Sequence, residues 1–469
     1  MEKTIDSSVQ NLAFTSDDAE NKIQAGRPLF EGVVLERTKK HRVVVVGGGA
    51  GGLELATKLG DRLGRRGQAE IFLVDKTLVH LWKPLLHEAA AGTLSVEEFG
   101  VTYLGHATQH HFRFRFGTMD GLDRERKEIH LAPTVDEDGN EISPHRVIPY
   151  DTLVVAVGSV TNDFGIPGVR EHAWPLDESL DAVKFHRKLL AAAVHCQILH
   201  GDEPLDIAIV GAGATGVELS AELHYMVRQF VSYGLDNLDP KRIRVRLISS
   251  TPRILPGLPE QLSKDVHAYL EKLGIEIYCN EFVTEVRKTE VITKSGKTFP
   301  AIATVWAGGI KAPDFLAGIG LQTNKLNQIV VNEYLQSTLD ANVYAIGDCA
   351  AAHWHGQEPN VLVPPRAQAA HQEASLLAKN IIGILKGRPL RPYRYRDFGS
   401  LVSLGKNQAL GTLLGPGRSR LKVQGVLARL MYWSLHQKHL IALHGYVRTG
   451  LKLASNLIAR PAIPRIKLH

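Results

Sequence analysis

Cysteine is scarce in this chain: Cys196, Cys279 and Cys349 are the only three among 469 residues. They lie far apart and form neither a C-x-x-C pair nor a spacing typical of metal ligands. This distribution predicts a protein of a reducing compartment without disulfide bonds, and we expect no metal site. It also argues against redox chemistry that depends on neighbouring cysteines.

Long apolar runs are missing as well. No stretch approaches the roughly 18 to 20 apolar residues that span a bilayer. Residues 1–40 contain no apolar core flanked by basic residues, so we expect a mobile polar extension there and no secretory leader. A chain that does not cross the membrane offers no evident path for vectorial proton transport.

Acidic residues are absent from one end of the chain. None follows Asp397, whereas eleven lysines and arginines do, so the net charge of +6 resides in this end. A basic segment of this kind usually has an anionic partner. Nucleic acid is not the expected partner, because no recognised nucleic-acid fold or aromatic stacking platform accompanies the charge.

A repeated segment sets the predicted architecture. Residues 41–59 read HRVVVVGGGAGGLELATKL and residues 206–223 read DIAIVGAGATGVELSAEL. Each begins with apolar and β-branched residues, turns on glycines and continues with apolar residues at helical spacing. With 43 glycines and 44% hydrophobic residues, the chain is predicted to be an α/β protein with two Rossmann-like dinucleotide-binding domains.

The first repeat carries the glycine fingerprint of dinucleotide binding at Gly47, Gly49 and Gly52. The first glycine permits the turn, the second lets the pyrophosphate approach and the third lets helix and strand pack closely. Asp75 ends the next strand, about 20 residues further on, where it can accept hydrogen bonds from a ribose. The alternative is an ordinary structural turn with a solvated aspartate.

The second repeat places Gly211, Gly213 and Gly216 in the same pattern. Its next strand ends in Ser249, where NAD-binding domains carry an acid that accepts from the ribose 2′-hydroxyl. Arg253 is close enough in sequence to pair with a 2′-phosphate. We therefore expect activity with NADH and some tolerance of NADPH.

The order of motifs resembles the two-dinucleotide-binding flavoproteins, in which an NAD(P)H domain interrupts a FAD domain. Three further stretches carry this resemblance: 153–158 (LVVAVG), 305–309 (VWAGG) and 343–348 (VYAIGD). The resemblance implies that Gly158, Gly347 and Asp348 contact FAD, with Asp348 on the ribityl chain. It also implies that Gly308 and Gly309 pass beside the nicotinamide.

The resemblance also implies the domain boundaries. The expected parts are the extension 1–40, a first FAD part 41–165, an NAD(P)H domain 166–315, a second FAD part 316–395 and a membrane-associating region 396–469.

The lack of suitably placed cysteines argues against two families of these flavoproteins. Disulfide reductases carry a redox cysteine pair where this chain has residues 81–88 (LWKPLLHE), and sulfide:quinone reductases also need cysteines. What remains closely resembles the bacterial type II NADH:quinone oxidoreductases, which do not pump protons. The matching stretches are 82–88 (WKPLLHE), 213–224 (GATGVELSAELH), 309–316 (GIKAPDFL), 363–372 (VPPRAQAAHQ) and 441–446 (IALHGY).

This resemblance implies a reaction and a location. NADH would give hydride to FAD, which would pass two electrons to ubiquinone or menaquinone, at the cytoplasmic face of a bacterial inner membrane. A homodimer is also expected. Two alternatives remain open: a soluble NAD(P)H-dependent reductase of a ferredoxin-like protein, and a FAD- and NADH-sensing binding protein without turnover.

Residues 363–372 look like the start of a helix aimed at the flavin, with Ala367 in its first turn. A helix N-terminus there would stabilise negative charge on the flavin. Gln368 and Gln372 are four residues apart, so their amides share one face and can donate to a quinone oxygen. Two surface glutamines are the plain alternative.

Glu218 follows Gly216 on the second Rossmann helix. The resemblance implies a role at the nicotinamide and quinone sites, in orientation or proton delivery. A carboxylate that complements the helix dipole is the alternative. Lys83 is expected along the flavin, whereas we expect His87 and Glu88 to be structural.

The acid-free end predicts amphipathic helices that lie on anionic lipid. One spans 427–443, and a second begins at Val447. Packing on the body of the protein or a dimer contact are the alternatives. The expected apolar face of the second helix comprises Val447, Leu451, Ala454 and Ile458, and the polar face comprises Arg448, Lys452, Asn456 and Arg460.

Overall fold

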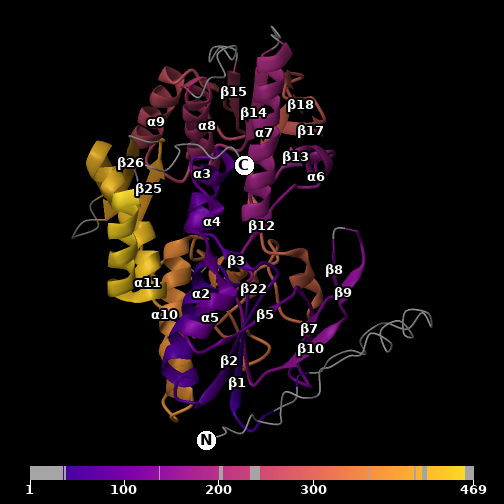
Figure 1. The fold of residues 1–469 in the computed structure, drawn as a ribbon, viewed down its shortest axis with the longest axis vertical. Coiled ribbons are helices and arrows are strands. Elements are labelled where there is room, and N and C mark those ends of the chain that lie inside the picture. Colours follow the sequence, from indigo (N-terminus) through magenta and orange to yellow (C-terminus); the bar gives the residue numbers. More distant parts are fainter. Residues whose placement is uncertain are drawn as a thin grey trace, which may run out of the picture.

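A computed structural model describes residues 35, 38–136, 138–199, 204–232, 243–358, 360–405, 408–414 and 420–459. The expected extension 1–40 falls almost wholly outside these residues. Figure 1 shows two α/β units, one above the other, with a long helix along one side.

The lower unit is built on a five-stranded parallel sheet. Its central strand carries Val43 to Val46, all at most 3% exposed, as expected for a strand covered on both faces. Helices α2 (Ala50–Leu59) and α10 (Ala367–Ile384) pack against each other. In sheet order the strands are β23 (Val343–Ala345), β11 (Thr152–Val155), β1 (His41–Val46), β2 (Ala69–Asp75) and β5 (Arg113–Phe116).

Strand β23 joins this sheet from residues that follow the whole upper unit in sequence. It pairs in parallel with β11, Leu153 opposite Val343. The expectation that the first dinucleotide-binding domain is interrupted and completed later is therefore confirmed. A three-stranded antiparallel sheet accompanies it: β10 (Arg146–Pro149), β7 (Glu128–Leu131) and β6 (Met119–Asp123).

The upper unit repeats the plan with a second five-stranded parallel sheet (Figure 1). In sheet order its strands are β13 (Ala173–Trp174), β20 (Ala303–Trp306), β14 (Leu205–Val210), β15 (Ile243–Ile248) and β16 (Glu276–Tyr278). Its helices are α7 (Ser179–Leu199), α8 (Ala214–Ser232) and α9 (Glu260–Lys272). An antiparallel sheet follows: β17 (Val283–Arg287), β18 (Glu290–Thr293) and β19 (Thr298–Pro300).

Two chain segments cross between the units as a short antiparallel pair, β12 (Val160–Thr161) with β21 (Ile310–Lys311). The indole of Trp306 donates to the Asn162 carbonyl at 2.8 Å. Strands β11 and β20 both end within five residues of this link. The carboxyl ends of the two parallel sheets, where α/β folds bind ligands, therefore face the same junction.

Short elements occupy the remaining connections. They are β3 (Val79–His80), α3 (Leu86–Ala90), α4 (Val96–Phe99), β4 (Val101–Thr102), α5 (Tyr103–Gln109), β8 (Thr134–Val135), β9 (Glu141–Ser143), α6 (Val169–His172), β22 (Ile329–Val330) and β24 (Ala350–Ala351).

The region after residue 396 contains a sheet as well as the expected helices. It opens with an antiparallel sheet of β25 (Gly399–Ser403), β26 (Ala409–Leu414) and β27 (Arg420–Gln424). This sheet packs on α8 and α9 of the upper unit. Short apolar stretches on either side of the Gly-Pro-Gly sequence at 415–417 are a hairpin pattern that the charge-based prediction overlooked.

Helix α11 (Gly425–Ala459) runs along the side of the molecule in Figure 1 and also contacts α2. Gly445, with φ 75° and ψ 174°, divides it into two helical segments. These correspond to the two helices expected from the sequence. Within the part of the chain that the structure describes, no helix is both long enough and apolar enough to span a membrane.

One side of α11 is buried against the protein and the other is apolar and exposed. His439 and Leu443 are at most 1% exposed. Ala454 also lies on the surface, whereas the side chains of Asn456 and Ile458, and all of Arg460, lie outside the described residues. The large exposed apolar side chains are Val426, Leu427, Leu430, Trp433, Leu435, Tyr446, Val447 and Leu451.

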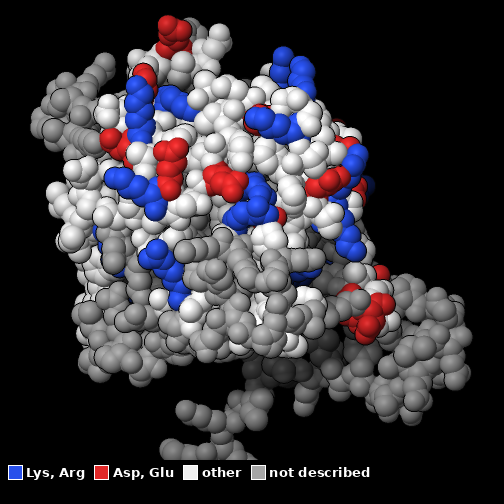
Figure 2. All heavy atoms as spheres, turned by 90° about the horizontal axis from the view of Figure 1, so that it is seen from above, with Lys and Arg blue, Asp and Glu red and all other residues white. Residues whose placement is uncertain are grey.

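The surface at the top of the upper unit carries charges of both signs. Figure 2 shows lysines and arginines interleaved with aspartates and glutamates across this face. Among the described residues no field of one sign gathers there, so we do not assign this face to an anionic partner.

We predict opposite effects for two glycine substitutions in α11. Gly445→Ala should lower the free energy of unfolding by about 1–3 kcal/mol, because an L-residue is strained at this φ and ψ. Gly450→Ala should raise it by up to about 1 kcal/mol, since Gly450 is helical and a Cβ there meets open space. Thermal unfolding of both variants checks this, and equal midpoints would contradict it.

Candidate functional site

The turn between β1 and α2 leaves room for a pyrophosphate. A Cβ on Gly47, at φ 101°, would lie 2.3 Å from the Ala156 carbonyl oxygen, and one on Gly52 would lie 1.9 Å from the oxygen of Gly47. A Cβ on Gly49 would meet no atom within 4 Å. Two glycines are therefore required by packing, while the space at Gly49 and the N-terminus of α2 suit a phosphate.

Asp75 lies at the end of β2, beside this turn. One carboxylate oxygen accepts from the Gly48 amide at 2.6 Å, and the other accepts from the amide and hydroxyl of Thr77 at 2.8 and 2.7 Å. These bonds fix the carboxylate next to the glycine loop, where a ribose bound with the pyrophosphate would lie.

The turn between β14 and α8 has the same construction. A Cβ on Gly211 would lie 2.2 Å from the Ala307 oxygen, one on Gly216 would lie 2.0 Å from the Gly211 oxygen, and one on Gly213 would meet open space. The two repeats recognised in the sequence therefore form two equivalent dinucleotide cradles.

The residues expected to choose between NADH and NADPH lie beside the second cradle. Ser249 is buried, and its hydroxyl shares a hydrogen bond of 2.8 Å with that of Thr251. The Arg253 guanidinium donates to the carbonyls of Leu255, Pro256 and Leu258 at 2.7 to 3.1 Å. Pairing of Arg253 with a 2′-phosphate would require it to give up some of these bonds.

Four predicted flavin contacts meet at the junction. The Lys83 ammonium, from the short helix Lys83–Leu85, donates to the Ser159 carbonyl at 2.8 Å. The Ser159 hydroxyl donates to the Asp348 carboxylate at 2.8 Å. Gly158 and Gly347, at φ 71° and 73°, form the backbone on either side. Loops after β11 and β23 therefore place these residues together, as their place in the motifs predicted.

Glu373 is a contact that the sequence analysis missed. It lies on α10, is 2% exposed, and accepts from the Gly347 amide at 2.6 Å. Burial raises its pKa to about 7. A glutamate in a helix of apolar residues gave no sign of this partner, which is 26 residues away in sequence.

The N-terminus of α10 begins at Ala367, as expected. Gln368 and Gln372 lie on one face, but their amides hold the segment 396–399. Gln368 donates to Asp397 and to the Gly399 carbonyl at 3.2 and 3.1 Å, and Gln372 donates to the Arg396 carbonyl at 2.9 Å. Their contact with a quinone stays a prediction.

Gly308 and Gly309 follow β20 at the junction. A Cβ on Gly309 would lie 2.8 Å from the ring of Phe164, and one on Gly308 would lie 3.2 Å from the Trp306 indole. The backbone here therefore passes close to aromatic side chains.

Glu218 is buried on α8, where one of its oxygens accepts from the Ser403 amide of β25 at 2.9 Å. Burial raises the pKa of its carboxyl to about 8, and nearby Glu88 and Glu222 add to the effect. The side chain is therefore mostly protonated at neutral pH and can act as an acid.

Glu88 belongs to the same acidic cluster, although we expected it to be structural. Burial and Glu222 raise its pKa to about 8 as well. His87 lies 3.5 Å from Glu218, but burial lowers its pKa to about 4, so this contact joins two neutral groups at neutral pH. Tyr432 of α11 lies beside this cluster, and its hydroxyl donates to the Pro84 carbonyl at 3.3 Å.

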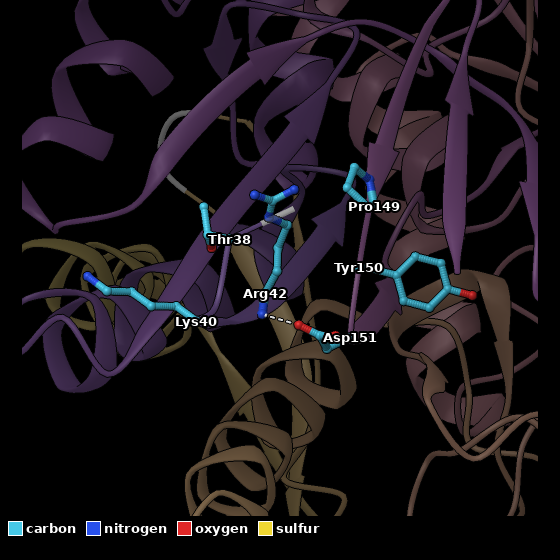
Figure 3. A pocket seen from close by; sticks show the side chains of 6 residues that line it. All are labelled: Thr38, Lys40, Arg42, Pro149, Tyr150 and Asp151. Carbon is cyan, nitrogen blue, oxygen red and sulfur yellow. Dashed lines mark hydrogen bonds between the residues drawn. The ribbon is translucent and has the colours of Figure 1, made fainter. Parts of the chain in front are cut away.

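A small pocket lies at the opposite end of the lower sheet. Figure 3 shows its six lining residues, with the amide of Arg42 bonded to the Asp151 carboxylate at 2.7 Å. Its volume of about 30 Å³ suits a single water molecule. It is too small for a dinucleotide and lies away from the glycine loops.

Two dinucleotide cradles that face one junction define a flavin-dependent pyridine-nucleotide oxidoreductase. Residues 41–374 match the family model described as pyridine nucleotide-disulphide oxidoreductase. Despite that name, the three cysteines of this chain are free.

Comparison with known proteins shows which family within this class the chain resembles. The type II NADH:quinone oxidoreductase of Haemophilus influenzae is 42% identical over 91% of this chain and 99% of its own length. That of Staphylococcus aureus is 29% identical over 80% and 90%. This chain therefore belongs to the type II NADH:quinone oxidoreductases, and its cofactors are FAD and NADH.

Solved structures agree with the fold. NDH2 of Plasmodium falciparum in complex with NADH has a TM-score of 0.76 at 20% identity, covering 92% of this chain and all of that one. The sulfide:quinone oxidoreductase of Aquifex aeolicus has a TM-score of 0.67 at 19% identity, covering 89% and 95%.

We predict that Ser249→Glu raises the ratio of NADH to NADPH kcat/KM at least about tenfold, or 1.4 kcal/mol. A carboxylate there would accept from the 2′-hydroxyl and repel a 2′-phosphate. Ser249→Gln controls for size, because it adds no charge. If the wild-type enzyme already prefers NADH by many hundredfold and Ser249→Glu leaves that unchanged, the assignment of this position is wrong.

We predict that Glu218→Gln flattens the pH dependence of stability. The folded-state pKa of about 8 exceeds the ordinary 4.5, so the stability contributed by this group falls as pH rises between these values. The variant should therefore match the wild type near about pH 4 and exceed it near about pH 9 in thermal unfolding. Glu260→Gln, at an exposed carboxylate on α9, is the control, and parallel wild-type and Glu218→Gln profiles would contradict the prediction.

Proposed function

We propose that this chain oxidises NADH and passes two electrons by way of FAD to a membrane quinone, without pumping protons. The observation that carries the proposal is the meeting of both glycine cradles at one junction that lacks a cysteine pair. The relative from Haemophilus influenzae, named for this reaction, matches the chain over nearly its whole length.

The residues present fit FAD. The glycines leave the space that the FAD pyrophosphate needs, and the carboxylates of Asp75 and Asp348 can accept hydrogen bonds from FAD. FAD, when bound, supplies acceptance of hydride from the nicotinamide and delivery of two electrons. Lys83, Ser159 and Asp348 hold one another in place beside it. Their role is to orient the cofactor and to exclude water.

Reduction of a quinone by NADH consumes one proton from solution. We propose that Glu218 and Glu88 carry this proton to the junction. Two buried carboxyls with pKa values near 8 keep at least one proton at neutral pH. The Ser403 amide fixes the orientation of Glu218, so β25 positions the acid.

Gln368 and Gln372 border the proposed quinone position at the start of α10. Each Gln amide has two N–H donors. Gln372 donates one to the Arg396 carbonyl, so its second N–H can reach a quinone oxygen without breaking this bond. Gln368 uses its amide nitrogen for two contacts and would have to release one.

We propose that the exposed apolar side of α11 lies in the membrane interface at the cytoplasmic face. Leu430 and Trp433 are 58% and 48% exposed. The same end of the chain is basic and free of acids, which favours anionic lipid. A homodimer also stays a prediction, because these apolar residues could instead meet a second copy.

The test measures NADH oxidation by the FAD-loaded protein with short-chain ubiquinone and menaquinone, with and without anionic liposomes. We expect quinone-dependent turnover and binding to the liposomes. The double substitution Leu430→Ser and Trp433→Ser should weaken that binding more than tenfold, since each side chain contributes about 1.5–3 kcal/mol when buried. Ile142→Ser, at an equally exposed side chain in β9, is the control.

Other outcomes would redirect the assignment. NADH-driven flavin reduction without quinone turnover would replace the quinone with a protein acceptor such as a ferredoxin. Tight NADH binding without flavin turnover would indicate a sensor. Turnover without liposome binding would leave the reaction standing and remove the membrane role of α11.

A further inference from the structure

Three histidines meet where α11 packs against the lower unit, apart from the cradles. His106 and His110 are one turn apart at the end of α5, and His444 directly precedes the kink at Gly445. One ring nitrogen of each lies within 4.8 Å of those of the other two. The sequence analysis expected no metal site and missed the H-x-x-x-H spacing of 106 and 110.

Hydrogen bonding fixes the tautomer of His106. Its Nε2 lies 2.8 Å from the Thr57 hydroxyl, which itself donates to the Leu53 carbonyl at 2.7 Å. Because that hydroxyl has one proton to give, it accepts from His106, and Nε2 carries the hydrogen. The Nδ1 atom therefore has a free lone pair, and it is buried with no bond to any described residue.

His110 is oriented in the same way by a carboxylate. Its Nδ1 lies 3.0 and 3.1 Å from the two oxygens of Asp61, so Nδ1 carries the hydrogen and donates. The Nε2 atom is buried without a partner among the described residues. A carboxylate behind one ring nitrogen is the usual support of a metal-binding histidine, since it orients the ring and makes the other nitrogen more basic.

The ring centroids of His106 and His110 are 4.3 Å apart. The ring of His444 packs edge-on to that of His106, with a centroid distance of 5.3 Å. The nitrogens of His106 and His110 that lack a partner among the described residues are buried, and leaving buried polar atoms unpaired is costly. We propose that His106, His110 and His444 bind a divalent cation of the zinc class. Three imidazoles, with a water molecule as fourth ligand, suit such an ion.

Charges around the site have opposing effects on a cation. Asp61 supplies a negative charge, whereas Arg448 and Lys452 follow His444 on α11 and disfavour positive charge. The Arg448 guanidinium is directed to Gln109, at 2.8 Å.

The proposed ion would join two parts of the chain that are far apart in sequence. His106 and His110 belong to the lower unit, while His444 belongs to the helix proposed to meet the membrane. Binding should therefore hold α11, at the kink, against α5. This inference does not depend on the proposed reaction, because binding can be measured without turnover.

The experiment uses the full-length, FAD-loaded protein without an affinity tag, stripped with a chelator and then dialysed against buffered Zn²⁺. We expect one zinc per chain by mass spectrometry. With Co²⁺ as probe, we expect visible absorption beyond the flavin bands that is typical of tetrahedral coordination. On addition of Zn²⁺, hydrogen exchange around residues 440–450 should slow.

Four variants test the assignment. His444→Gln should weaken Zn²⁺ binding at least tenfold, and so should His106→Gln. Asp61→Asn, at a half-exposed residue that is no ligand, should weaken it about 10- to 100-fold. His145→Gln, at an exposed histidine beside His130, should change nothing.

Flavin content and flavin reduction by NADH show whether each variant is folded. If His106→Gln fails to fold, His444→Gln and Asp61→Asn still decide the matter. Absence of stoichiometric zinc in the wild type, or zinc binding that neither of these substitutions weakens, would overturn the proposed site.

Discussion

Close approach of backbone to backbone at the glycine turns is the constraint on which this structure depends. At Gly47, Gly52 and Gly211 a single added carbon would lie within about 2.3 Å of a carbonyl oxygen. The strand, the turn and the helix can pack only without it. The same packing leaves the space at Gly49 open and directs helix amides toward it, so fold and cofactor binding rest on one steric condition.

The same geometry also produces the junction between the two units. Because parallel strands in both units end at the crossing pair β12 and β21, residues from distant parts of the chain meet there. Lys83, Ser159 and Asp348 form one chain of hydrogen bonds, although 265 residues separate the first from the last. Burial also raises the pKa values of Glu88 and Glu218 to about 8, which favours their protonated forms at neutral pH.

The C-terminal region contacts both units, and its basic charge did not predict these contacts. Its sheet supplies the Ser403 amide to Glu218, and its helix contributes Tyr432 to the acidic cluster and His444 to the histidine cluster. One side of α11 is thereby part of the protein core, while the other side is free to meet lipid. Arg429, in the segment proposed to reach the membrane, thus acts electrostatically on Glu88, one of the proposed proton donors.

The sequence by itself determined the two cradles, their order and the interrupted domain, because a glycine turn between a strand and a helix is a local feature. It also determined that Glu218, Gln368 and Gln372 lie on helices. Only the tertiary structure decided which groups meet: Glu373 with Gly347, Glu88 with Glu218, the glutamine amides with residues 396–399, and three histidines from two helices. Such contacts, and the pKa values that burial imposes, depend on residues brought together across the chain, and no local pattern encodes them.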